Sequence, residues 1–199
     1  MKKISLILLS LILIFNISSA NTYSTDPKFF VEELVNDAIN KLSDKNITEN
    51  DKKKFIEKIA LENVDINALG LYTLGDLRKT TSKDVLVKYQ QVFEKYFLVT
   101  LTSRLTDYSS KKFEVVDAEK KSATYTMVRS KIVESDSQPE IKIDWRIYTK
   151  NPEKPLIRDL IVEGLSLART QKEEFSSILS SNNNDINILI SKLEEFNSN

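Results

Sequence analysis

Apolar residues recur at spacings of three and four along the start of the chain, which predicts helices. Asp26-Pro27 suits the cap and first position of a helix. The apolar positions that follow are Phe30, Val31, Leu34, Val35, Ala38, Ile39 and Leu42. We therefore expect a helix that ends near Ser43. A second helix should begin at Thr48, because Asp51 stands three residues later and can complete a reciprocal cap.

A longer apolar and aromatic stripe predicts a long helix that begins after Thr81-Ser82. Its members are Val85, Leu86, Tyr89, Val92, Phe93, Tyr96, Phe97, Thr100, Leu101 and Leu105. The stripe is either the core-facing side of this helix or, in addition, one wall of a ligand cavity. The segment before it is interrupted by Gly70 and Gly75, which favour close helix packing or turns.

The period of the pattern changes from helical to alternating near Phe113, which predicts strands. The expected strands are 113–118, 123–133, 141–148 and Leu156 to about Leu165. Short polar connections between them favour an antiparallel meander. A helix over about Thr170–Ser180 follows, and Asp185 can cap a final one. The order of helices, strands and helices predicts an α+β fold: a four-stranded antiparallel sheet packed by the N-terminal, long and C-terminal helices.

The first 20 residues resemble a cleavable secretory signal, so they are set apart from the fold. Lys2 and Lys3 precede an apolar run of 14 residues, and Ser18-Ser19-Ala20 supplies the small residues of a cleavage site. We expect a mature chain over 21–199 that forms a single domain. Without Lys2 and Lys3, 27 of the 29 basic residues remain against 29 acidic ones, a net charge of −2 with no basic stripe. Nucleic-acid binding is therefore not expected.

The chain contains no cysteine and no histidine among its 199 residues. The missing cysteines remove disulfides, thiol nucleophiles and an N-terminal lipid attachment, so a free periplasmic protein is expected instead of a lipoprotein. The missing histidines remove the commonest general base and most zinc sites. Neither an enzyme nor a metal site is expected.

Several segments together resemble the MlaC family, also called toluene-tolerance proteins. The final strand and its continuation, Arg158-Asp159-Leu160-x-Val162-Glu163-Gly164-Leu165-Ser166-Leu167, carry the most specific similarity. Ile143-Asp144-Trp145-Arg146-Ile147 is similar to the family's aromatic-arginine strand. Pro27-x-x-Phe30-Val31 and the Leu74-Gly75 pair are similar to its helices. The resemblance covers about 27–193.

The resemblance implies an NTF2-like sheet with a helical annex and a periplasmic phospholipid carrier. Such a carrier shields acyl tails in an apolar cavity. It moves lipid between an outer-membrane lipoprotein or porin complex and an inner-membrane ABC transporter complex, which maintains outer-membrane lipid asymmetry. The phospholipid is cargo and no cofactor is implied. The mixed-charge surface favours a monomer.

Apolar residues on one face of the strands and on the long helix are the candidate lipid-binding residues. They are Phe93, Phe97, Leu101, Tyr125, Met127, Ile143, Trp145, Ile147, Leu165 and Leu167. We expect the strand residues to face the helix residues across one cavity. Each of them could equally be ordinary core, so a second hypothesis is an adaptor of the same fold with a filled interior and a partner-binding surface.

The charged residues of the last strands allow two interpretations. Arg146, Arg158 and Asp159 could form a structural ion pair across neighbouring strands, or an arginine could contact a lipid phosphate through paired N–H donors. Asp159 and Glu163, four residues apart in an extended strand, would be about 13 Å apart. That separation argues against a glycosidase-like carboxylate pair, and an NTF2-like enzyme is the least favoured hypothesis.

Overall fold

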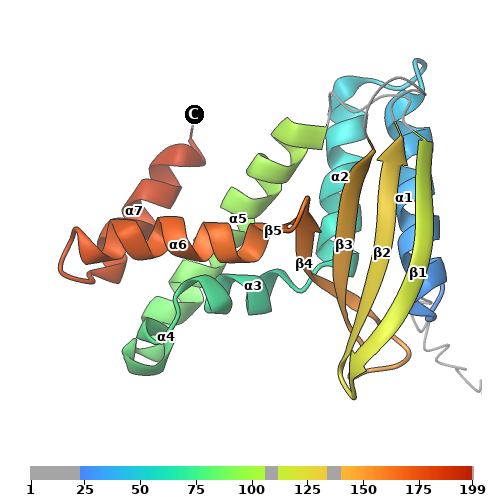
Figure 1. The fold of residues 1–199 in the computed structure, drawn as a ribbon. Helices are drawn as coiled ribbons and strands as arrows, with labels where there is room; N and C mark the ends of the chain where they lie inside the picture. The colour runs from blue at the N-terminus through green and yellow to red at the C-terminus, as the bar shows by residue number, and fades with distance from the viewer. Residues whose placement is uncertain (1–22, 106–111, 134–139, 199) are drawn as a thin grey trace, which may run out of the picture.

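The computed structural model describes residues 23–105, 112–133 and 140–198. The predicted signal segment lies outside these ranges. The described chain is α+β, as predicted, with its elements arranged in a sheet layer and a separate group of helices (Figure 1). No helix in the described part of the chain is long and apolar enough to cross a bilayer.

The sheet layer begins with two capped helices. Asp26 accepts hydrogen bonds from the backbone N–H groups of Lys28 and Phe29 and starts α1 (Pro27–Ser43), while Thr48 accepts from Asp51 N–H and starts α2 (Glu49–Asn63). Both caps confirm the sequence predictions. The two helices lie against one face of the sheet (Figure 1).

The sheet has five strands instead of the four predicted, in the order β1-β2-β3-β4-β5. The strands are β1 (Lys112–Ser122), β2 (Tyr125–Val133), β3 (Ile141–Tyr148), β4 (Leu156–Val162) and β5 (Leu165–Ser166). All neighbours are antiparallel, so the predicted meander is confirmed. The extra strand arises because Glu163 and Gly164 have φ values of 49° and 82° and turn the predicted last strand back on itself.

The remaining elements form a helical module beside β4. It contains α3 (Ile66–Thr73), α4 (Leu77–Thr80), α5 (Lys83–Leu105), α6 (Leu167–Ser180) and α7 (Ile186–Phe196). Figure 1 shows this module to the side of the sheet, not over it. The expectation that the long and C-terminal helices cover the sheet is therefore wrong; α1 and α2 cover it.

Each layer has its own apolar core. The core of the sheet layer contains Phe30, Val31, Val128, Trp145 and Ile147, packed between α1, α2 and the sheet. The core of the helical module is built around α5 and the terminal helices. Its members include Tyr89, Phe93, Phe175, Leu189, Ile190 and Leu193. Val64, at the α2–α3 junction, packs against both cores.

Candidate functional site at the junction of the two layers

A β-bulge in β4 places two consecutive charged side chains at the junction. Arg146 of β3 pairs with Asp159, but the next pair along is Ile147 with Ile157, so Arg158 is an extra residue in β4. Arg158 therefore shares the side of Asp159 instead of alternating with it. Both side chains point away from α1 and α2.

Arg158 is fully engaged by its neighbours. Its Nε and Nη2 atoms bind Asp65 Oδ2 at 2.8 and 2.7 Å, and Nη1 donates to the Tyr125 hydroxyl at 3.2 Å. The guanidinium carbon lies 3.4 Å from the centroid of the Tyr148 ring. Burial lowers the pKa of Arg158, but the hydrogen bonds to Tyr125 and Asp65 outweigh it and raise the pKa above its usual value. Arg158 is therefore a permanent cation that fastens the sheet to α3.

Asp159 is held by the start of α6. Its side chain is 1% exposed, and its oxygens accept from the Ser166 hydroxyl at 2.7 Å and from Ala168 N–H at 3.0 Å. Ser166 itself caps α6 through Arg169 N–H. Arg146 Nη1 lies 3.4 Å from Asp159 Oδ2, so the predicted structural ion pair across neighbouring strands is present.

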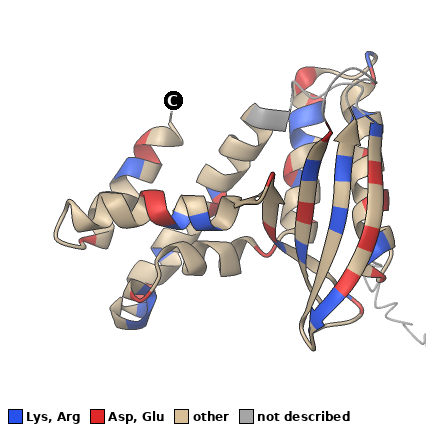
Figure 2. Ribbon diagram, viewed as in Figure 1, with Lys and Arg blue, Asp and Glu red and all other residues tan. Residues whose placement is uncertain are grey.

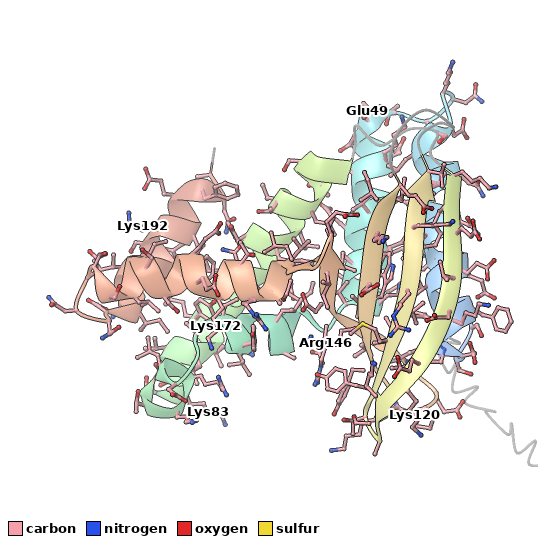
Figure 3. The ribbon with its side chains drawn as sticks, viewed as in Figure 1. Glu49, Lys83, Lys120, Arg146, Lys172 and Lys192 are labelled. Atoms are coloured by element: carbon pink, nitrogen blue, oxygen red, sulfur yellow. The ribbon has the colours of Figure 1, made fainter. Side chains whose placement is uncertain are left out.

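A pocket of about 210 Å³ opens between these groups and the helical module. Its walls come from α3, α6 and three strands. They are Ala68, Leu69, Tyr72, Tyr125, Arg146, Arg158 and Ala168. Lys172 of α6 lies beside it, with its Nζ 5.3 Å from the centroid of the Tyr72 ring. Figure 3 shows Arg146 on the sheet side and Lys172 on the helix side of this junction. The pocket is thus part apolar and part cationic.

The structure does not bring the predicted lining residues together around one cavity. Val128 pairs with Trp145 and Met127 with Arg146, so Met127 and Tyr125 lie on the opposite face from Trp145. Ile143, Trp145 and Ile147 face α1 and α2, with Trp145 Nε1 donating to Ser130. The prediction that they face the long helix is wrong, because the register of β2 and β3 turns them to the other layer.

The candidate lipid-binding residues of α5 lie in the other layer, the helical module. Phe93 is buried in the core of the helical module, and Phe97 packs at its edge. Leu101 is half-buried near the end of α5. Leu165 and Leu167, which flank the cap of α6, are exposed. Tyr125 alone among the predicted lipid-binding residues lines the pocket; the charged candidates Arg146 and Arg158 line it too.

Sequence reasoning missed the contribution of α3. Ala68, Leu69 and Tyr72 form a short apolar wall, and Gly70 within the helix and Gly75 after it interrupt its helical period. Asp65 was the available signal, because an Asp before an apolar run is a common helix cap. It does cap α3, through Ala68 N–H.

The described residues contain no group of three or more acidic, histidine or cysteine side chains placed to hold a metal ion. The outer face of the sheet instead carries paired charges. Arg129 binds Asp117 and Glu119, and Lys131 binds Glu140. Figure 2 shows the mixed signs along these strands. These pairs occupy the face of the sheet that α1 and α2 leave uncovered.

The fold defines a class: a meandering antiparallel sheet covered by two helices, with a helical module attached through its fourth strand. The chain matches the model of the family described as MlaC protein over residues 32–195, and it belongs to that family. A search of curated proteins gave no match.

A search of solved structures gave a phospholipid-binding protein from Ralstonia solanacearum, determined in complex with a phospholipid. The TM-score is 0.69 at 17% sequence identity, over 84% of this chain and 94% of that one. This likeness concerns the fold.

Proposed function

We propose that this protein binds one phospholipid and carries it through the periplasm between an outer-membrane complex and an inner-membrane ABC transporter complex. Membership of the MlaC family supports the proposal, as does the bound phospholipid of a protein with the same fold. Maintenance of outer-membrane lipid asymmetry would be the result of such transport. Carrying lipid requires no reacting group, so no catalytic residue is assigned.

The physical task is to keep acyl tails out of water. Each CH₂ exposed to water costs about 0.8 kcal/mol, so two tails with about 30 carbons would cost on the order of 20 kcal/mol or more. A carrier must therefore offer apolar surface that its own core does not use.

The observation that carries the proposal is the exposure pattern of α5 near its end. Residues 96–101 are all half-buried, with none fully covered and none fully exposed. Five of the six are apolar or aromatic: Tyr96, Phe97, Leu98, Val99 and Leu101. A helix packed on one side shows buried and exposed positions in alternation. This segment instead keeps apolar surface partly available all round.

The pocket at the junction is too small for the cargo. Its volume of about 210 Å³ is below the 300–1,000 Å³ typical of pockets for drug-sized ligands. Lipid loading therefore requires the sheet layer and the helical module to separate. We assign the tails to the half-buried or exposed candidates Phe97, Leu101, Tyr125, Met127, Leu165 and Leu167. Phe93, Ile143, Trp145 and Ile147 would contact lipid only where a closed core opens.

The small pocket also favours the alternative function, an adaptor of this fold that binds no lipid. Native mass spectrometry of residues 21–199, purified from a bacterial periplasm without detergent, separates the two. We expect a mass excess of one phospholipid, confirmed by extraction. A bare protein that also takes no lipid from vesicles would contradict the carrier function and support the adaptor.

A further inference from the structure

The two arginines that line the junction pocket differ in how much of their hydrogen-bonding capacity is in use. Arg158 has an acceptor for Nε and for both terminal nitrogens, and its face is stacked on Tyr148. It has little capacity left for a ligand. Arg146 is different: within the described chain its guanidinium has one partner, Asp159, at 3.4 Å.

Asp159 competes only weakly with a ligand for the N–H donors of Arg146. Both carboxylate oxygens already accept hydrogen bonds from the start of α6, and the side chain is 1% exposed. The side chain of Arg146 is 42% exposed. The guanidinium is therefore held at the pocket by attraction to a buried carboxylate, while its other N–H donors have no acceptor among the described residues.

The charges around the pocket favour an anion. Of the side chains that the structure describes, those that line the pocket include two cations, Arg146 and Arg158, and no carboxylate. Lys172, near Tyr72, also interacts with the carboxylate of Asp76. Arg158 neutralises Asp65 directly. Asp144 lies two residues before Arg146 on β3 and is paired in register with Arg129. An anion at the pocket would meet the free edge of Arg146.

A planar guanidinium with free donors matches a phosphate, whose two non-bridging oxygens can accept parallel N–H bonds. We propose that Arg146 binds the phosphate of the cargo lipid, so that the protein selects phospholipids over uncharged diacyl lipids. The inference rests on the proposed function, because it requires that lipid enters at this junction. Arg158 acts as the rigid support of the same wall.

In the test, the mature protein is mixed with lipid vesicles. The vesicles contain equal amounts of phosphatidylglycerol and of diacylglycerol with identical acyl chains. The protein is then re-isolated and its lipid is extracted and quantified. A charge-assisted bidentate contact contributes enough for about a tenfold preference. We expect wild type to take up phosphatidylglycerol about tenfold over diacylglycerol, and Arg146→Gln to reduce that ratio to about one.

The matched control is Arg129→Gln, on the neighbouring strand and the same face. Arg129 donates to Asp117 and Glu119 at 2.8 and 2.6 Å, so it has no free edge toward the pocket. This variant should keep the wild-type ratio, and Arg146→Lys should fall between the two. A urea midpoint for each variant shows that it is folded.

The outcomes separate the two proposals. A wild type that takes up neither lipid overturns the carrier function itself. A wild type that takes up both lipids equally, as Arg146→Gln does, leaves the carrier function standing and overturns the role of Arg146. Inorganic phosphate is the second probe. If it binds wild type but not Arg146→Gln while lipid selection is absent, the site belongs to a free anion and the lipid inference is overturned.

Discussion

Asp65 and Arg158 form the ion pair that joins the two layers of the protein, although they are 93 residues apart in the chain. Asp65 also caps α3 through Ala68 N–H, and its own backbone N–H donates to Ile157 O at 2.9 Å. One residue therefore fixes the start of α3, the position of β4 and the orientation of Arg158.

Asp65→Ala should lower the free energy of unfolding by about 2 kcal/mol, from loss of a helix cap and of a half-buried ion pair. Asp65→Asn keeps a capping side chain and should lose only the ion-pair part. Urea denaturation measures both. Asp76 provides the control, because it precedes α4 without a side-chain cap and is 88% exposed. If Asp76→Ala lowers the free energy of unfolding as much as Asp65→Ala does, Asp65 contributes no more to stability than an exposed carboxylate before a helix.

Asp159 should be the most costly carboxylate to remove at the junction. Asp159→Ala leaves the half-buried Ser166 hydroxyl and Ala168 N–H without their acceptor, which should cost about 2 to 4 kcal/mol. Ser166→Ala removes the cap of α6 and one of the two hydrogen bonds to Asp159, and should cost about 1 to 2 kcal/mol. Because the two side chains share a hydrogen bond, the double variant should cost less than the sum. Additive costs in a urea titration would show that they act independently.

Gly70 of α3 lies close against Phe93 of α5. A Cβ there would lie 2.8 Å from Cδ1 of Phe93, whose ring also packs against Tyr89 and Phe175. Gly70→Ala should therefore destabilise the protein by about 1 to 2 kcal/mol, although alanine favours a helix. Phe93→Leu should cost less in the Gly70→Ala background than in wild type. Equal costs in the two backgrounds, measured by thermal unfolding, would rule out this contact as the cause.

Local signals in the sequence were sufficient to predict the five longer helices and most of the strands, but not the short helices α3 and α4. The Asp26-Pro27 and Thr48 caps act within four residues, and the alternation of β3 needs no partner. Which face of the sheet packs against α1 and α2 could not be predicted from local signals. It depends on contacts between distant segments, such as the pairing of Val128 with Trp145. The bulge at Arg158 and the turn at Glu163-Gly164 likewise depart from the two-residue period. The candidate pocket combines these departures, so sequence reasoning named its arginines and Tyr125 but also assigned to it Ile143, Trp145 and Ile147, which lie on the other face of the sheet.

Tyr89 should make the stability of the protein sensitive to alkaline pH. Burial raises the pKa of its hydroxyl, and the hydrogen bond with Thr73 opposes this only in part. A folded-state pKa above the unfolded value of 10.0 gives stability that is complete below pH 10 and is lost as pH rises further. Tyr89→Phe should be about 1 kcal/mol less stable than wild type at pH 7. The gap should narrow above pH 10, as followed by urea denaturation, and a constant gap would contradict this origin.

A substitution at Leu101 should best distinguish an effect on lipid binding from an effect on folding. Leu101 is half-buried in the segment of α5 that we assign to the tails, so Leu101→Ala should cost less than about 1.5 kcal/mol while it lowers the lipid content per chain. Leu193, 4% exposed in the core of the helical module, is the matched control. Leu193→Ala should cost about 2 to 5 kcal/mol and leave the lipid content of the folded protein unchanged. Native mass spectrometry and urea midpoints of both variants supply the two readings. Unchanged lipid in Leu101→Ala would show that the end of α5 does not contact the tails, because a tail held there would lose its contacts with the removed methyl groups.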